Sequence, residues 1–119
     1  MKIVGTYPNT RLRRNRKSKW SRDLVSEFNL SSKDLIWPIF LIEGHNKKVR
    51  IPSMPNVFKY SIDKLGNVVE KAINLGIPLL ALFPNTPLHL KNYNGSESLN
   101  ENNLVCNALK FIKKRFGNK

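Results

Sequence analysis

The residues of this chain that could do chemistry are few and lie far apart in the sequence. It contains two histidines, His45 and His89, and one cysteine, Cys106. A metal site needs at least three converging ligands, and neither histidine has another histidine or cysteine close to it in sequence. We therefore expect no metal site and no catalytic residue in this chain, with both histidines at the surface and Cys106 as a buried thiol in a helix.

Glu43 is a further candidate acid or base, because it follows an apolar run and opens a polar loop that we expect over residues 43–60. A lone glutamate in such a position is usually solvated. No glycine-rich phosphate loop follows either apolar run, which argues against a nucleotide enzyme. These residues alone present no catalytic constellation.

Two apolar runs would position any site at their carboxyl ends. Residues 35–41 and 79–83 are apolar on both faces, as in parallel strands that helices cover. Pro38 cannot donate a hydrogen bond, so it predicts a free edge or a bulge in the first strand. We expect the two strands to be parallel neighbours, with residues 79–83 central and buried.

Three helices are predicted around these strands. Ser21 is a candidate N-cap for a short helix through Phe28, and Ser61 for a helix over residues 62–75 with one apolar stripe. A last helix begins at residue 100 or 102 and ends at Gly117. Its predicted inner face consists of Leu104, Val105, Ala108, Leu109, Ile112 and Phe116. Alternating strands and helices predict a parallel α/β sheet, either doubly wound or an eight-stranded barrel, and two such strands are too few to complete it.

The formal charge of +13 is concentrated near the start of the chain. Residues 1–22 hold eight basic residues and no acid, so we predict a basic N-terminal arm there and an incomplete strand–helix domain over residues 23–119. Such an arm can bind nucleic acid or lie along a neighbouring subunit. Residues 11–22 contain a single aromatic, Trp20, so nucleic acid is the less favoured partner.

The start of the chain lacks the apolar core of a signal peptide, and no run approaches the ~18 apolar residues of a membrane span. A single cysteine permits no internal disulfide. We expect a cytoplasmic protein without a membrane partner.

Several segments together resemble the porphobilinogen synthase family, also called the 5-aminolevulinate dehydratases. They are Arg11-Leu12-Arg13-Arg14-Asn15-Arg16, Asp34-Leu35-Ile36-Trp37-Pro38-Ile39-Phe40, Ile51-Pro52-Ser53-Met54-Pro55-Asn56-Val57, Leu75-Gly76-Ile77-Pro78, Ala81-Leu82-Phe83-Pro84-Asn85-Thr86-Pro87, and Gly95-Ser96-Glu97 followed by Asn100. The order and spacing of these segments carry the resemblance, which runs from about residue 10 to residue 118 and covers the N-terminal third of the family.

The resemblance implies a lyase of haem biosynthesis that condenses two 5-aminolevulinate molecules to porphobilinogen. It implies an oligomeric TIM (β/α)8 barrel, of which this chain would be the N-terminal portion with about two strand–helix units. The resemblance implies that the family's Schiff-base lysines and its zinc or magnesium segment would follow Lys119. None of Lys47, Lys48, Lys64 or Lys110 matches a Schiff-base motif, and Cys106 does not match the metal cysteines. We therefore expect the chain alone to be inactive and to hold no cofactor.

The same resemblance assigns roles to a few residues. Phe83 and Pro84 would close the second strand at the wall of the substrate pocket. The subunit-assembly arm would contain Arg11, Arg13, Arg14 and Arg16, with Arg16 as the candidate for a magnesium contact between subunits.

The partners that follow are full-length subunits or a complementary C-terminal fragment, and 5-aminolevulinate would bind only to the complete enzyme. Two other functions stay open. The chain could be a non-catalytic assembly or regulatory partner of a full-length enzyme, or a basic nucleic-acid-binding protein.

Overall fold

The computed structural model describes residues 5–6, 8–10 and 13–117 of the 119-residue chain. Arg11, one of the predicted arm residues, lies outside the described residues. The chain divides into two compact units, residues 1–30 and residues 31–119. Among the described residues, none of the helices has the length and apolar character needed to cross a membrane.

The first unit contains a short 3-10 helix, η1 (Arg14–Arg16), and one α-helix, α1 (Lys19–Leu24). The predicted helix from Ser21 to Phe28 is therefore placed too late in the sequence. Ser18 is the N-cap, because its backbone is extended and its N–H donates to Ser21 Oγ at 3.4 Å. Ser21 Oγ in turn donates to the Ser18 carbonyl at 2.9 Å, so Ser21 belongs to the first turn rather than preceding it.

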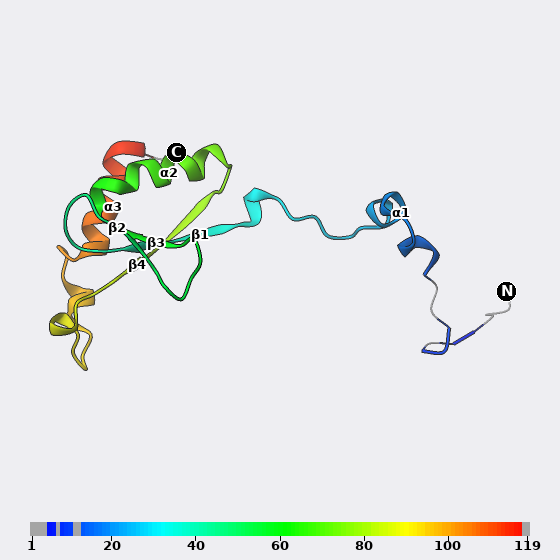
Figure 1. Ribbon diagram of the computed structural model, residues 1–119, viewed down its shortest axis with the longest axis horizontal. Coiled ribbons are helices and arrows are strands. Elements are labelled where there is room, and N and C mark those ends of the chain that lie inside the picture. Colours follow the sequence, from blue (N-terminus) through cyan, green and yellow to red (C-terminus); the bar gives the residue numbers. More distant parts are fainter. Residues whose placement is uncertain (1–4, 7, 11–12, 118–119) are drawn as a thin grey trace. The chain divides into compact units, whose positions relative to one another are not determined.

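The second unit is built on a four-stranded sheet with the order β2-β3-β1-β4 (Figure 1). Its strands are β1 (Ile36–Leu41), β2 (Lys48–Arg50), β3 (Phe58–Tyr60) and β4 (Leu79–Pro84). β1 and β4 pair in parallel along their whole length, from Ile36 opposite Leu79 to Leu41 opposite Pro84. The predicted parallel pairing of these two strands is confirmed.

The predicted central position of the second strand is wrong. Among the described strands β4 lies at one edge of the sheet, and Leu79 and Phe83 are each 50% exposed. β1 takes the interior place instead, because β3 pairs in parallel with its end at Phe40 and Leu41. Pro38 precedes the residues of β1 that pair with β3, so β4 is its one neighbouring strand among those described. The free edge that this proline predicts is therefore present.

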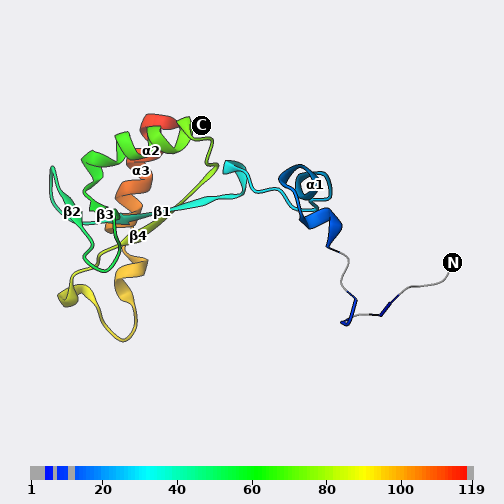
Figure 2. The same ribbon diagram turned by 45° about the vertical axis from the view of Figure 1, so that its right-hand side comes forward.

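Both main helices pack on one face of the sheet (Figures 1 and 2). α2 (Leu65–Asn74) follows a 3-10 turn, η3 (Ile62–Lys64). α3 (Leu104–Phe116) follows two further 3-10 turns, η4 (Leu88–Leu90) and η5 (Ser96–Leu99). The buried centre consists of Ile39 and Leu41 from β1, Leu65 from α2 and Ala108 from α3. Residues of β1, α2 and α3 therefore form the hydrophobic core on the face of the sheet that the helices cover.

The face of the sheet away from the helices stays apolar and open. Side chains alternate along a strand, so Ile36 and Phe40 of β1 lie on the same face as Leu79 and Phe83 of β4. Ile36 is 60% exposed, and the rings of Phe40 and Phe83 are 5.7 Å apart. This apolar surface is of the kind that a parallel sheet normally buries.

Three further expectations are corrected: the plain loop over residues 43–60, the inner face of the last helix, and its start at residue 100 or 102. The segment 43–60 is not a plain loop, because β2 and β3 form an antiparallel hairpin within it. The inner face of α3 contains Phe111 in place of Leu109, which is 46% exposed. The helix begins at Leu104 because Asn103 caps it, with its Oδ1 accepting the Cys106 N–H at 2.8 Å.

Ser61 joins the hairpin to the helix that follows it. Its side chain is fully buried, and its Oγ accepts the Lys47 N–H at 2.9 Å and donates to the Lys47 carbonyl at 3.3 Å. The Ser61 N–H donates to the same carbonyl at 3.1 Å. The predicted N-cap residue thus acts as a buried tie to the loop before β2, and its side chain makes no capping hydrogen bond to η3.

Ser61→Ala leaves the Lys47 N–H without its buried partner, so we expect the free energy of unfolding to fall by about 1–3 kcal/mol. Urea denaturation of the chain measures the change. Ser53→Ala, an exposed serine in the hairpin loop, is the matched control and should change it by less than about 0.5 kcal/mol. Equal effects of the two substitutions would contradict the role given to Ser61.

Candidate functional site

The carboxyl ends of β1, β3 and β4 meet at one edge of the sheet and are tied together there. The Asn85 N–H, just after β4, donates to the Leu41 carbonyl at 2.9 Å, and the Ile42 N–H donates to the Tyr60 carbonyl at 3.0 Å. Lys59 Nζ donates to Asn85 Oδ1 at 3.0 Å and so links β3 to the loop after β4. Ligands of parallel α/β sheets bind at this edge.

A cavity of about 380 Å³ opens at these strand ends, between the loop after β4 and the start of α3. We call it the strand-end cavity. It is lined by Glu43, Pro84, Thr86, Pro87, Leu90, Glu97, Ser98, Asn103, Leu104, Val105 and Cys106. The sequence pointed to Glu43 from its position after an apolar run and to Pro84 from the family resemblance. It did not indicate residues 97–106, which reach the cavity only because α3 folds back over the sheet.

The strand-end cavity has acidic and apolar walls but no amine. Glu97 is held by the Asn100 side-chain amide, which donates to its two carboxylate oxygens at 3.3 and 3.4 Å. Cys106 is partly buried rather than fully buried, and its thiol is free. Within the described part of the chain, no lysine lines this cavity. These walls can bind a ligand, but they contain no group able to form a Schiff base.

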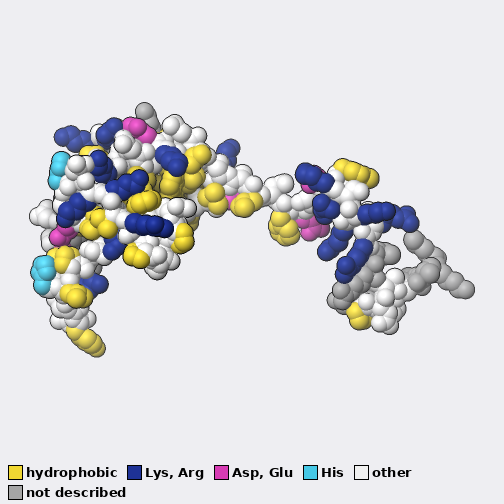
Figure 3. All heavy atoms as spheres, in the orientation of Figure 1, with side chains coloured by type: hydrophobic (Ala, Val, Ile, Leu, Met, Phe, Trp, Pro, Cys, Tyr) yellow, Lys and Arg dark blue, Asp and Glu magenta, His cyan; other side chains and the backbone are white. Residues whose placement is uncertain are grey.

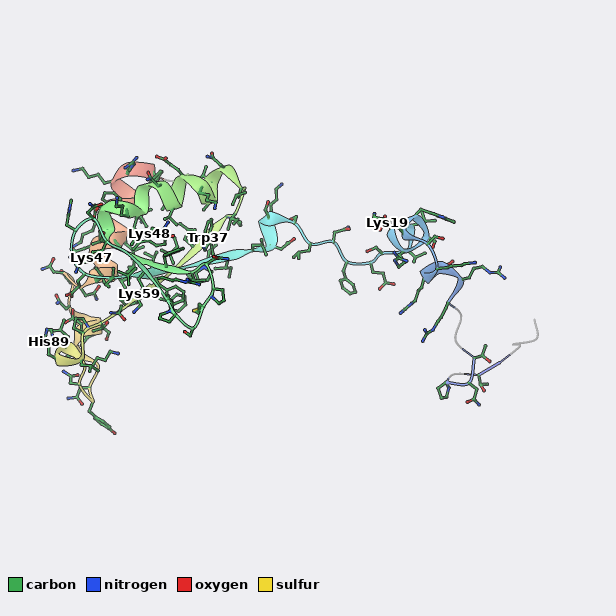
Figure 4. The ribbon with its side chains drawn as sticks, in the orientation of Figure 1. Lys19, Trp37, Lys47, Lys48, Lys59 and His89 are labelled. Atoms are coloured by element: carbon green, nitrogen blue, oxygen red, sulfur yellow. The ribbon has the colours of Figure 1, made fainter. Side chains whose placement is uncertain are left out.

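The residues predicted from the sequence do not come together here. Pro84 lines the cavity, whereas Phe83 lies on the other face of β4 against Phe40. His45 and His89 are exposed and lie on different loops, and Figure 4 labels His89. Among the described residues, no group of three or more histidine, cysteine, aspartate or glutamate side chains could hold a metal ion. The donor set here therefore does not fit zinc or magnesium.

The first unit gathers cations of its own. Arg13, Arg14, Arg16 and Lys17 line a shallow depression of about 670 Å³. Arg22 Nη1 donates to the Arg16 carbonyl at 3.0 Å. Figure 3 shows the lysine and arginine side chains of this unit at its surface. The predicted arm residues other than Arg11 are thus available to an acidic partner.

Two parallel strands, each followed by a helix on the same face, define an α/β protein of the class that includes barrels and doubly wound sheets. The chain belongs to the delta-aminolevulinic acid dehydratase family, whose model matches residues 9–119. The resemblance noted from the sequence motifs is confirmed.

Known proteins support this assignment. The chain is 51% identical over 106 residues to delta-aminolevulinic acid dehydratase of Bradyrhizobium diazoefficiens, covering 89% of this chain and 30% of that protein. It is 44% identical over 106 residues to the enzyme of Chlamydia pneumoniae, covering 89% of this chain and 32% of that protein.

A solved structure is also similar to this chain. It is delta-aminolevulinic acid dehydratase (porphobilinogen synthase) from Toxoplasma gondii in complex with the reaction product porphobilinogen. It matches with a TM-score of 0.81 at 35% identity, covering 92% of this chain and 31% of that one. The chain therefore spans about a third of the length of these relatives, and its fold is consistent with part of a barrel.

Beside β2, Asp63 makes the carboxylate contact that fixes the turn after β1. Its two oxygens accept the Asn46 N–H at 3.0 and 3.1 Å. The Ser61 side chain beside it is the main cause that lowers the pKa of Asp63, and the Asn46 N–H and the charge of His45 act in the same direction. A lowered pKa means that the folded state favours the ionised carboxylate.

Asp63 therefore stabilises the fold above its unfolded pKa of 3.8 and loses this contribution as pH falls through the lower folded value. We expect Asp63→Asn to flatten the decrease in the free energy of unfolding between neutral pH and pH values below 3.8. Urea denaturation at a series of pH values measures this decrease. Glu101→Gln, an exposed carboxyl of α3's leading loop, serves as the charge-matched control, and an unchanged acid slope in Asp63→Asn would contradict the assignment.

Proposed function

We propose that residues 9–119 form the N-terminal portion of a porphobilinogen synthase barrel. β1 with α2 would be its first strand–helix unit, and β4 with α3 its second. The observation that carries this proposal is the TM-score of 0.81, at 35% identity, to an enzyme in complex with porphobilinogen. The parallel register of β1 and β4 supports it, because successive barrel strands pair in this way.

The complete protein, on this proposal, is a cytoplasmic lyase of haem biosynthesis that condenses two 5-aminolevulinate molecules to porphobilinogen. The part contributed by this chain is positional. Pro84 stands at the strand-end cavity, and Phe83 presents its ring on the open sheet face, where we propose that it forms part of the substrate-pocket wall. Zinc or magnesium would be bound by residues other than those described here.

Residues 1–119 alone should not catalyse this reaction. A Schiff-base lysine needs a lowered pKa in a closed pocket, whereas no described lysine lines the strand-end cavity and the opposite sheet face is exposed. The groups that react would then come from other strands of the barrel.

We therefore expect no porphobilinogen from the purified chain with 5-aminolevulinate. A chimera in which residues 9–119 replace the matching segment of the Bradyrhizobium diazoefficiens relative should form porphobilinogen at a rate within about tenfold of that relative. A colour reaction of porphobilinogen measures its formation by the chain alone and by the chimera. Turnover by the chain alone, in preparations free of host enzyme, would contradict its predicted inactivity, and a folded but inactive chimera would contradict the proposed function.

The basic arm is proposed to bind a neighbouring subunit rather than nucleic acid. Its cations Arg13, Arg14 and Arg16 line one depression, and Trp20 is 71% exposed. Exposed tryptophan and arginine in one short unit match the composition of protein interfaces, where both residue types are enriched. A full-length subunit is the partner that this arm would contact.

Replacing Arg13, Arg14 and Arg16 by glutamine in the chimera should weaken subunit association by at least about tenfold, because three charge-assisted contacts are lost. Analytical ultracentrifugation across a dilution series measures association. The control replaces Lys110, Lys113 and Lys114 of α3 by glutamine, which removes the same charge. Unchanged association, together with duplex DNA binding that falls about 10³-fold between 50 and 200 mM salt, would favour the nucleic-acid interpretation instead.

A further inference from the structure

A second cavity, of about 510 Å³, lies between α2 and the sheet and is lined by three lysines and no acid. We call it the lysine cavity. Lys48 reaches it from β2, Lys64 from η3 and Lys71 from α2. Figure 4 labels Trp37 and Lys48, which belong to its walls. It shares no residue with the strand-end cavity.

Aromatic rings, rather than carboxylates, hold two of these lysines in place. Lys71 Nζ lies 5.8 Å from the centre of the Trp37 ring, and Lys48 Nζ lies 4.4 Å from that of Phe58. Cation–π contacts of this kind orient an ammonium group without neutralising it.

The three ammonium groups have no carboxylate partner among the described residues. In the part of the chain that the structure describes, the ion pairs are Lys19 with Asp23 and Arg115 with Glu70, so none involves the lysine cavity. The neighbouring acid, Asp63, is engaged by the Asn46 N–H. Like charges around one cavity repel one another, and a bound anion relieves that repulsion.

Neutral donors complete the lining. Asn46, Asn67 and Tyr60 also line the cavity. Burial raises the pKa of Tyr60, so its hydroxyl stays protonated and able to donate at neutral pH. Every polar side chain of the lining can therefore donate a hydrogen bond to an oxyanion.

The spacing of the lysines favours a ligand with more than one charged group. Lys64 and Lys71 are two helical turns apart, about 10 Å along the axis. Two linked anionic groups on one ligand can contact both lysines across this span, whereas a single small anion offers one centre of charge for both. Lysine is also a common phosphate ligand, acting as a point charge.

We infer that the lysine cavity, bounded by Trp37, Lys48, Lys64 and Lys71, binds a compact anion that carries two or more phosphate or carboxylate groups. This site goes beyond the proposed function, which uses none of these residues. It can therefore be tested without measuring activity.

The test follows the two tryptophan indole N–H signals of the ¹⁵N-labelled full chain, assigned with Trp20→Phe. Pyrophosphate and citrate are titrated separately at constant ionic strength, with sodium chloride as the reference. We expect a saturable shift of the Trp37 signal and little change at Trp20, which lies in the basic arm. A response to pyrophosphate alone identifies phosphate as the ligand group, a response to citrate alone identifies carboxylate, and a response to both supports recognition by charge.

The matched variants separate the site from general positive charge. Lys64→Gln with Lys71→Gln should weaken binding by about tenfold or more, whereas Lys110→Gln with Lys114→Gln, which removes the same charge from α3, should change it by less than about twofold. No saturable shift, a shift confined to Trp20, or equal losses in the two double variants would overturn the inference. If the chain alone gives a poorly dispersed spectrum, the same titration is made on the chimera. The absence of a saturable shift of its Trp37 signal counts against the site whether or not the chimera is active.

Discussion

The parallel pairing of β1 with β4 is the interaction on which the rest of the second unit depends. It sets six residue pairs in register, so Ile39 and Leu41 point with Leu82 toward the helices while Phe40 and Phe83 point to the other face. α2 connects these strands and α3 follows the second of them, and Leu65 and Ala108 close the core on the side where both helices lie. The same register brings the ends of both strands to one edge, which places the strand-end cavity there.

The hairpin supplies β1 with its second neighbour, but only at its end. β3 pairs with Phe40 and Leu41, and Ser61 fixes the hairpin by its buried contacts to Lys47. The first part of β1, including Pro38, and the outer side of β4 therefore keep unpaired backbone edges in the described sheet. Together with the exposed apolar face, these edges have the geometry of a sheet that continues in both directions, as the strands of a barrel do.

Much of this fold could be predicted from the sequence, because the long elements carry strong patterns. The apolar runs of β1 and β4 and the stripe of α2 were predicted to within a few residues, since burial on a helix-covered sheet demands continuous apolar strands. The hairpin was missed because its strands have three residues each, too few for a visible alternation. The exposure of Leu79 and Phe83 was also missed, since it depends on which strands lie beside β4 and not on local sequence.

The site was less predictable, because its residues converge only in three dimensions. Glu43 follows β1 and Pro84 ends β4, so both were visible as candidates, whereas Glu97 and Cys106 reach the strand-end cavity through the fold of α3. The lysine cavity likewise draws its lysines from three elements, Lys48, Lys64 and Lys71. Their convergence could not be predicted, because the charge pattern of the sequence is dominated by the basic arm.

The composition of the strand-end cavity explains why family membership and activity are separate questions for this chain. In a parallel α/β sheet each strand delivers its own residues to the shared edge, and reacting groups usually come from several strands. β1 and β4 deliver a carboxylate and apolar groups to this edge but no amine among the residues described. Lys59 Nζ reaches this edge from β3 but donates to Asn85 Oδ1 and does not line the cavity. On the proposed function, a Schiff base in this cavity would therefore need a lysine from another strand, and β1 and β4 would contribute part of the wall beside it.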